Sequence, residues 1–251
     1  MPTSITFTDP EKLIDRTETT TVRLTVGDDG WDDGWDDGAI VPTDQWQPLG
    51  TADAELSRAN DDAAPSTVIE LVSGLLDHVI AHSTIAETPD VLDPLSGRHP
   101  ATFVGFTDSD PGKRTTTTDW STDRRIGVHL DNFDRLPVAD RTLARRRLGI
   151  NLGPGTRWLL VATTDVLDIC QTLGTDDPGH YPHTDDLRRY VADGHPLRLL
   201  RLLRIRLDPG DAYIAPTELL PHDGSTLGAS DPSRIAFWLG DWPVGILPSL
   251  I

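Results

Sequence analysis

The second half of the chain consists largely of short stretches in which apolar and polar residues alternate, with Gly, Pro and Asp between them. Alternation with a period of two indicates strands, and Gly, Pro and Asp mark the turns that separate them. The stretches are 126–133, 148–152, 157–162, 202–207, 212–215 and 234–239. A succession of short strands joined mostly by turns is typical of two facing sheets of jelly-roll type.

The order of the elements predicts a mainly β fold in one domain covering residues 1–251. We expect eight short strands over about residues 101–242 to form a double-stranded β-helix, a cupin-like arrangement, buttressed by a few helices. Residues 1–100 add two strands, an acidic loop and a support helix. Apolar residues recur in 65–81 at spacings of three and four, which predicts that helix.

Three further local predictions concern the second half. The sequence Gly153-Pro154-Gly155 separates two strands and is a hairpin signal. Short helices are expected over 165–173 and 184–192, the second with Thr184 as its N-cap. The basic segment 137–147 is expected to form a helical connection.

Composition limits the class of protein. Hydrophobic residues make up 37% and charged residues 25%, which suits a globular fold. A formal net charge of −18 repels phosphate backbones, so we do not expect nucleic-acid binding. The only cysteine is Cys170, so no intrachain disulfide can form. No apolar run approaches membrane-spanning length and no signal-peptide pattern is present, which predicts a cytoplasmic protein that does not enter membranes.

The stretch 126–133 contains His129 and Asp131. On a strand these two side chains point to the same face, and their backbone positions lie roughly 6.6 Å apart, two rises of about 3.3 Å. An imidazole and a carboxylate so placed can bind one metal ion. Two ligands rarely suffice, and His222, 91 residues after Asp131, is the candidate for the third. Two histidines and one carboxylate form the facial triad of non-haem Fe(II) oxygenases.

Two more features accompany these ligands in a fixed order. The turn Asp208-Pro209-Gly210-Asp211 precedes His222, and Arg234 follows it by twelve residues. The ordered set resembles the Fe(II)/2-oxoglutarate-dependent oxygenases over roughly residues 126–240. This resemblance implies that His129, Asp131 and His222 bind Fe(II). It also implies that 2-oxoglutarate binds the metal through its 1-carboxylate and 2-keto oxygen, and that O2 takes the remaining position.

The resemblance also implies the reaction class. Family members couple the decarboxylation of 2-oxoglutarate to succinate and CO2 to the oxidation of a substrate. Here we expect a small-molecule substrate, such as an amino acid or a natural-product intermediate. In the halogenating branch of the family a small residue replaces the carboxylate ligand. The presence of Asp131 therefore favours hydroxylation, desaturation or cyclisation over chlorination.

The distal carboxylate of 2-oxoglutarate needs an anchor. Arg234 is the first candidate, because a guanidinium binds a carboxylate through two parallel hydrogen bonds. Many family members carry Ser or Thr two residues after this Arg, whereas this chain has Ala236, so Thr226 is considered as a substitute hydroxyl. Arg157 is the rival anchor, on a strand expected to line the barrel. Asn151 is a candidate hydrogen-bond donor to the keto acid.

Two alternatives remain open. A cupin-like metalloenzyme that does not use 2-oxoglutarate would have the same fold, but the closely spaced His and Glu cluster of small cupins is missing. A non-catalytic β-sandwich binding module could use the Asp- and Trp-rich repeat at 28–37 to bind a cationic partner. That repeat is either a solvated acidic loop pinned by Trp31 and Trp35 or a lid over a pocket. The hydroxyl run Thr115–Thr118 is either a pocket border or plain surface.

Overall fold

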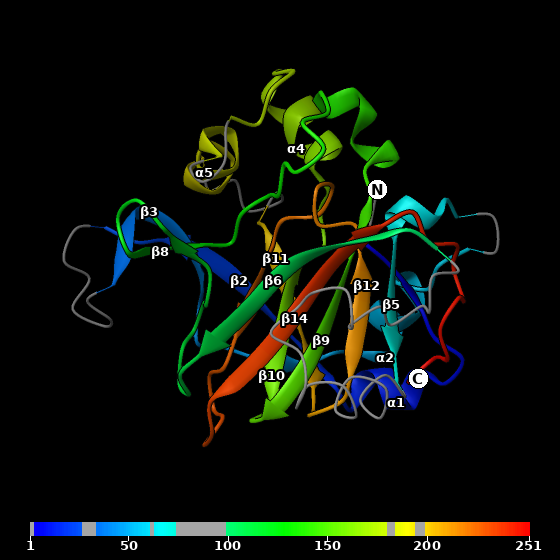
Figure 1. The fold of residues 1–251 in the computed structure, drawn as a ribbon. Helices are drawn as coiled ribbons and strands as arrows, with labels where there is room; N and C mark the ends of the chain where they lie inside the picture. Colours follow the sequence, from blue (N-terminus) through cyan, green and yellow to red (C-terminus); the bar gives the residue numbers. More distant parts are fainter. Residues whose placement is uncertain (1–2, 27–33, 61–62, 74–98, 180–183, 194–198) are drawn as a thin grey trace.

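Two β-sheets form most of the structure, and short helices lie at their ends (Figure 1). The computed structural model describes residues 3–26, 34–60, 63–73, 99–179, 184–193 and 199–251. The expectation of a mainly β fold is confirmed. No helix in these described ranges is long and apolar enough to cross a membrane.

The first sheet has six strands in the order β1-β5-β12-β9-β14-β6. Neighbouring strands run antiparallel, except that β1 and β5 are parallel. The bounds are Ser4–Thr6 for β1, Val68–Val72 for β5, Ala212–Ala215 for β12, Arg146–Pro154 for β9, Ser233–Gly240 for β14 and Ala101–Ser109 for β6.

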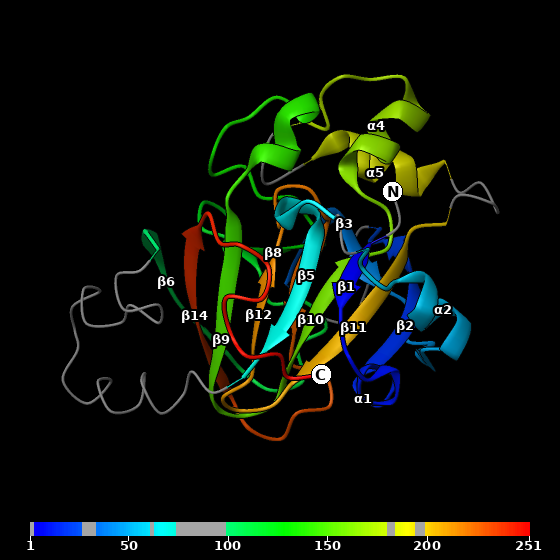
Figure 2. The same cartoon turned by 90° about the vertical axis from the view of Figure 1, so that its right-hand side faces the viewer.

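The second sheet has eight strands in the order β13-β10-β11-β2-β3-β8-β7, and β4 pairs with β2 beside this path. The bounds are His222–Ser225 for β13, Arg157–Ala162 for β10, Arg201–Leu207 for β11, Thr17–Leu24 for β2, Trp35–Pro42 for β3, Arg124–Gly127 for β8, Thr118–Asp119 for β7 and Gln47–Pro48 for β4. Figure 2 views the molecule from the side, with β6, β14 and β9 on one side and β11 and β2 on the other.

The chain changes sheets repeatedly in its second half. Strand β9 lies in the first sheet, β10 and β11 in the second, β12 in the first, β13 in the second and β14 in the first. The predicted hairpin at Gly153-Pro154-Gly155 is therefore wrong, since β9 and β10 do not pair with each other. The turn carries the chain from one sheet to the other.

A hydrophobic core fills the space between the sheets. Leu159 and Val161 of β10 and Ile205 of β11 contribute from the eight-stranded sheet, and Leu71 of β5 and Ile235 of β14 from the six-stranded sheet. Every one of them is at most 2% exposed. Because side chains alternate along a strand, the positions two residues away from these also face inward.

Helices cover one end and one outer face. Helices α4 (Val166–Leu173) and α5 (Asp185–Ala192) pack through Ile169, Leu187 and Tyr190 onto the outer face of the eight-stranded sheet. Both were expected from the sequence. Helices α1 (Pro10–Ile14) and α2 (Thr51–Leu56) lie at the other end of the molecule (Figure 1). The basic segment contains the 3-10 helix η3 (Val138–Leu143).

The support helix predicted over 65–81 is wrong where the structure describes it. Residues Pro65–Thr67 form the 3-10 helix η1, and β5 follows directly. All five residues of β5 are buried, and apolar residues lie on both of its faces, with Glu70 between Val68 and Val72 on one of them. A strand with apolar residues on both faces also satisfies the three- and four-residue spacing of a helix. Residues 74–81 lie outside the described residues.

Candidate metal centre

Backbone hydrogen bonds link the two histidines that the sequence predicts as ligands. The strand expected over 126–133 ends earlier, since β8 ends at Gly127 and His129 forms an isolated antiparallel bridge with His222. The amide of each histidine donates to the carbonyl of the other, at 3.0 and 2.9 Å. The amide of Asp131 donates to the carbonyl of Thr217 at 3.1 Å, which continues this irregular pairing. Residues 93 positions apart thus share one site.

The three predicted ligands form one buried cluster. One donor atom each from His129, Asp131 and His222 lie within 4.8 Å of one another. The side chains are 3 to 4% exposed. Nε2 of His129 lies 3.8 Å from Oδ1 of Asp131, and Nε2 of His222 lies 3.4 Å from Oδ2.

Both imidazole rings are held by their other nitrogen. Nδ1 of His129 lies 2.9 Å from the carbonyl oxygen of Gly127, and Nδ1 of His222 lies 3.1 Å from that of Leu220. A carbonyl accepts, so the proton sits on Nδ1 and the Nε2 lone pair faces the cluster. Burial lowers the pKa of His222 to about 3, which keeps this imidazole neutral. The donor set of two imidazoles and one carboxylate suits Fe(II).

Arg147 is a member of the site that the sequence analysis missed. Its Nη2 lies 2.5 Å from Oδ2 of Asp131, and its Nη1 lies 3.3 Å from Nε2 of His222. Its guanidinium also contacts the rings of Phe133 and Phe237, 5.3 and 5.0 Å from their centroids. Burial alone would raise the pKa of Asp131, but the charge of Arg147, followed by His222 and His129, lowers it.

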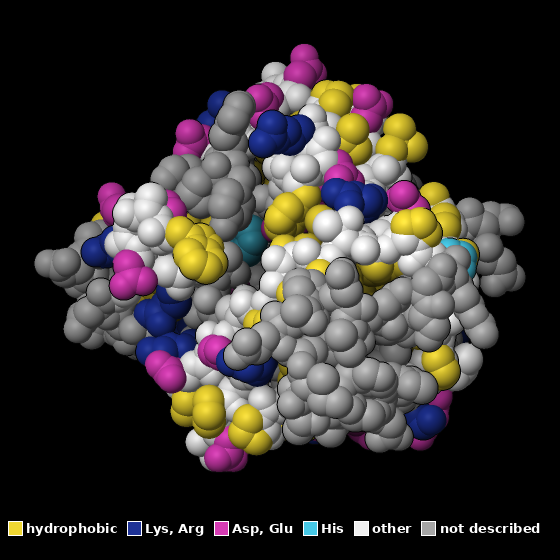
Figure 3. All heavy atoms as spheres, viewed as in Figure 1, with side chains coloured by type: hydrophobic (Ala, Val, Ile, Leu, Met, Phe, Trp, Pro, Cys, Tyr) yellow, Lys and Arg dark blue, Asp and Glu magenta, His cyan; other side chains and the backbone are white. Residues whose placement is uncertain are grey.

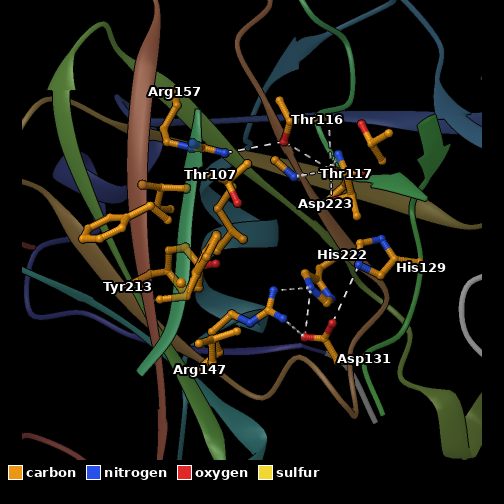
Figure 4. Close-up of a pocket in the computed structure, with 18 of the residues that line it drawn as sticks. Thr107, Thr116, Thr117, His129, Asp131, Arg147, Arg157, Tyr213, His222 and Asp223 are labelled. Atoms are coloured by element: carbon orange, nitrogen blue, oxygen red, sulfur yellow. Dashed lines mark hydrogen bonds and ion pairs between the residues drawn. The ribbon is translucent and has the colours of Figure 1, made fainter. Parts of the chain in front are cut away.

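These residues lie in a cavity of about 580 Å³ between the sheets. In Figure 4, Arg157 and Arg147 enter it from opposite sides, with the triad on one flank and Tyr213 on the other. Tyr213 of β12 pairs with Gly149 of the neighbouring strand β9. A Cβ atom on Gly149 would come 2.6 Å from the tyrosine ring. Glycine at this position is what allows the tyrosine to reach the cavity.

Arg157 is a buried cation that forms no ion pair with a carboxylate of the described residues, although the charge of the nearby Asp223 partly offsets the lowering of its pKa by burial. Of the four buried arginines in the described part of the chain, three form an ion pair with a carboxylate: Arg141 with Glu218, Arg146 with Glu70 and Arg147 with Asp131. Arg157 has only two long contacts of 3.5 Å, to the hydroxyls of Ser233 and Thr116. It shares the inward face of β10 with Leu159 and Val161, and burial lowers its pKa.

The hydroxyl run borders the cavity, through Thr116, Thr117 and Thr118. Oδ1 of the buried Asp223 accepts hydrogen bonds from the amides of Thr116 and Thr117, both at 3.1 Å, and from the Thr117 hydroxyl at 2.9 Å. Burial raises the pKa of Asp223. Next to it, a Cβ atom on Gly224 would come 2.5 Å from Nη2 of Arg157, so glycine leaves room for the guanidinium.

The first candidate for the carboxylate anchor, Arg234, does not line the cavity. Its side chain is 54% exposed and binds Asp108 through two hydrogen bonds of 2.7 and 2.8 Å. The inward residues of β14 are Ile235 and Phe237, which line the cavity. Arg234 shares the outer face of β14 with Ala236 and Trp238. Arg157, the rival candidate, lines the cavity.

Two other predicted contacts of the co-substrate also lie elsewhere. Nδ2 of Asn151 donates to the carbonyls of Gly155 and Leu207, at 3.0 and 2.9 Å, and its Oδ1 accepts from the Gly153 amide. The Thr226 hydroxyl donates to the carbonyl of Asp110 and accepts from the Lys113 amide. Both side chains stabilise turns, and neither lines the cavity.

The acidic repeat is described only from residue 34 onward, so the segment 28–37, predicted as either a solvated acidic loop or a lid, lies mostly outside the described residues. Trp35 begins β3, is 4% exposed and donates through Nε1 to the Thr115 hydroxyl at 2.8 Å. Trp35 is thus fixed to the fold, whereas Trp31 lies outside the described residues.

Comparison with known proteins gives no relative from which an activity could be transferred. No protein-family model matches the chain, and no curated protein matches it.

Proposed function

We propose that this protein is a mononuclear non-haem Fe(II) oxygenase that uses 2-oxoglutarate as co-substrate. One observation carries the proposal: the buried His129, Asp131 and His222 share a cavity with Arg157, a buried guanidinium that forms no ion pair with a carboxylate of the described residues. Burying an unpaired charge costs several kcal/mol, so such a charge is best explained by an anionic ligand.

The strand order supports the fold that this function requires. The alternation of β9 to β14 between the sheets supports the proposal of a double-stranded β-helix. In this alternation β14 lies between β6 and β9, and β10 lies between β13 and β11. The bridge between His129 and His222 places the segment that contains His129 and Asp131 beside β13. We therefore interpret the core as a double-stranded β-helix.

Different side chains would bind the metal and the co-substrate. His129, Asp131 and His222 would hold Fe(II), which when bound supplies the redox chemistry that activates O2. Three protein ligands leave positions for a bidentate keto acid and for O2. Arg157 would bind the distal carboxylate, with the hydroxyls of Ser233 and Thr116 beside it.

The surrounding residues keep the site apolar and ordered. Leu159, Ile235 and Phe237 line the cavity and limit access of water to the reacting centre. The carbonyls of Gly127 and Leu220 fix the imidazole rings. Because Asp131 supplies a carboxylate ligand, we propose hydroxylation, desaturation or cyclisation of a small molecule as the reaction.

The test measures succinate released from 2-oxoglutarate by protein reconstituted anaerobically with Fe(II) and then exposed to O2. We expect release by the wild-type protein, and a KM for 2-oxoglutarate raised roughly ten- to a hundred-fold in Arg157→Leu, because a charge-assisted pair contributes about 1.5–3 kcal/mol. Arg234→Leu is the matched control and should leave this KM unchanged.

Each contrary result would favour a different function or a different anchor residue. Iron binding without succinate release would favour a cupin-like metalloenzyme that needs no keto acid. Absence of iron binding would favour a non-catalytic β-sandwich module. A raised KM in Arg234→Leu alone would return the anchor role to Arg234.

A further inference from the structure

Exposed aromatic side chains gather at one place on the described surface. Phe106 and Phe133 are each 44% exposed and Trp120 is 98% exposed, and all three line the cavity that contains the candidate metal centre. No other Phe, Trp or Tyr in the described ranges is exposed to this degree. Val104, 39% exposed, lines the same cavity. We call these four residues the aromatic rim.

The rim residues come from separate parts of the chain. Val104 and Phe106 alternate on the edge strand β6, Trp120 lies in the turn between β7 and β8, and Phe133 follows Asp131 by two residues. In Figure 3 hydrophobic side chains lie on both sides of a hollow, with a histidine at its floor. Single exposed apolar residues are common, but a cluster around a cavity marks a binding surface.

Of the three carboxylates that line this cavity, two are paired with arginines, and the third is buried with its Oδ2 atom lacking a hydrogen-bond partner. Asp108 is bound twice by Arg234, and Asp131 is paired with Arg147. Asp223 is buried behind Thr116 and Thr117, which bind its Oδ1 atom, and its Oδ2 atom is also buried. None of the described acidic groups is thus available at the cavity surface to a substrate ammonium group.

A free amino acid would bring both an ammonium and a carboxylate into this cavity. Each charge needs a partner when it leaves water, and the cost of an unpaired one is several kcal/mol. Under the proposed function, Arg157 is used by the co-substrate and Arg147 by Asp131. The rim instead offers flat apolar surface, for which an uncharged ring system is the complementary ligand.

We propose that the substrate is an uncharged, largely apolar small molecule with an aromatic or similarly flat ring system, which binds against the aromatic rim. This proposal narrows the substrate class of the proposed oxygenase. It rests on the proposed function for the reaction, whereas binding of the ring system does not depend on that function. A cavity of about 580 Å³ lies in the range that accommodates drug-sized ligands. The ring system would lie at the mouth, beside Trp120 and Phe133, and the atom to be oxidised would point toward the metal ligands.

The test uses binding of N-phenyl-1-naphthylamine, an uncharged aromatic probe, followed by its fluorescence. We expect saturable binding of one probe per chain, with Kd raised at least ten-fold in Trp120→Ala and in Phe133→Ala. Leu143→Ala is the matched control, because Leu143 is 72% exposed and lies outside the cavity. Circular dichroism and thermal melting of each variant verify that the fold is retained, and a second variant, Trp120→Phe, should retain most of the binding.

Competition separates the substrate classes. 2-Naphthol should displace the probe at lower concentration than L-phenylalanine, which carries a ring of similar chemistry but two charges. Equal Kd values in the wild type and both rim variants, or stronger displacement by L-phenylalanine, would overturn the proposal. Probe binding without succinate release would refute the oxygenase and leave the rim as an apolar ligand site. Succinate release with no probe binding would refute the rim proposal alone.

Discussion

Nη2 of Arg147 lies 2.5 Å from Oδ2 of Asp131, so one of the three candidate metal ligands is also one half of a buried ion pair. The carboxylate is 4% exposed, and Nη1 of the same guanidinium lies 3.3 Å from Nε2 of His222. Arg147 therefore compensates the charge of the ligand set and fixes the orientation of Asp131. It is a positioning residue for the proposed metal centre.

Replacing Arg147 by Met should destabilise the protein when metal has been removed with a chelator. Breaking a buried pair leaves an uncompensated charge, which costs about 3–5 kcal/mol in the free energy of unfolding measured with urea. Arg234→Met removes an exposed pair and should cost less than about 1 kcal/mol. Added Mn(II) brings a new positive charge to Asp131, so it should stabilise Arg147→Met more than the wild type. Equal stability of the two proteins without metal would contradict this role.

Arg157→Leu should act in the opposite direction on stability. A buried guanidinium that forms no ion pair among the described residues opposes folding, and the shorter apolar side chain of leucine removes this charge from beside Leu159. We expect the free energy of unfolding to stay equal to that of the wild type or to rise by about 1 kcal/mol, while 2-oxoglutarate binding is weakened. A fall of several kcal/mol in urea unfolding would mean that Arg157 is structural.

The clustering of the three candidate ligands could be predicted from the sequence because its signal is local. The spacing of His129 and Asp131 puts both side chains on one face wherever the backbone is extended, and His222 lies downstream at the place that the resemblance implies. Arg147 has no such signal. It enters the site because β9 lies between β12 and β14, a relationship of strand order that no short spacing records.

The wrong predictions share one physical origin: the sequence does not show which face of a strand is buried. Strand β14 is apolar on both faces, through Ile235 and Phe237 on one and Ala236 and Trp238 on the other. Alternation separates the two sets of residues but does not show which set faces the cavity. The sequence therefore predicts Arg234 as the anchor, although its side chain points outward. The same ambiguity made the fully buried β5 resemble a helix, and turn residues alone did not reveal that β9 and β10 join different sheets.

A second buried ion pair ties the C-terminal segment to the six-stranded sheet. Nη1 of Arg146 lies 2.7 Å from Oε1 of Glu70, and Oε2 of Glu70 accepts from the amide of Gly245 at 2.6 Å. Glu70→Gln should lower the free energy of unfolding by about 3–5 kcal/mol in urea, because it leaves Arg146 buried without a counter-charge. Glu55→Gln, in an exposed pair with Arg58, is the control and should change it by less than about 1 kcal/mol.

Cys170 should be unreactive in the folded protein. The thiol is 3% exposed, and burial raises its pKa to about 11. Because the thiolate is the nucleophile, alkylation by iodoacetamide at pH 8 should be slow in buffer and fast in denaturant. The raised pKa favours the protonated thiol in the folded state, so this contribution to stability is present below pH 9 and is lost as the pH rises toward 11. Rapid alkylation of the native protein at pH 8 would show that the thiol is accessible.

The central claim is that His129, Asp131 and His222 bind one Fe(II), and anaerobic iron stoichiometry tests it most directly. After equilibration with excess Fe(II) and removal of unbound metal, we expect one iron per chain in the wild type and in His99→Ala, a histidine that does not belong to the cluster. His222→Ala should retain less than about a tenth of that iron, with an unchanged circular-dichroism spectrum, because two ligands rarely suffice to hold the metal. One iron per chain in His222→Ala, or none in the wild type, would contradict the account.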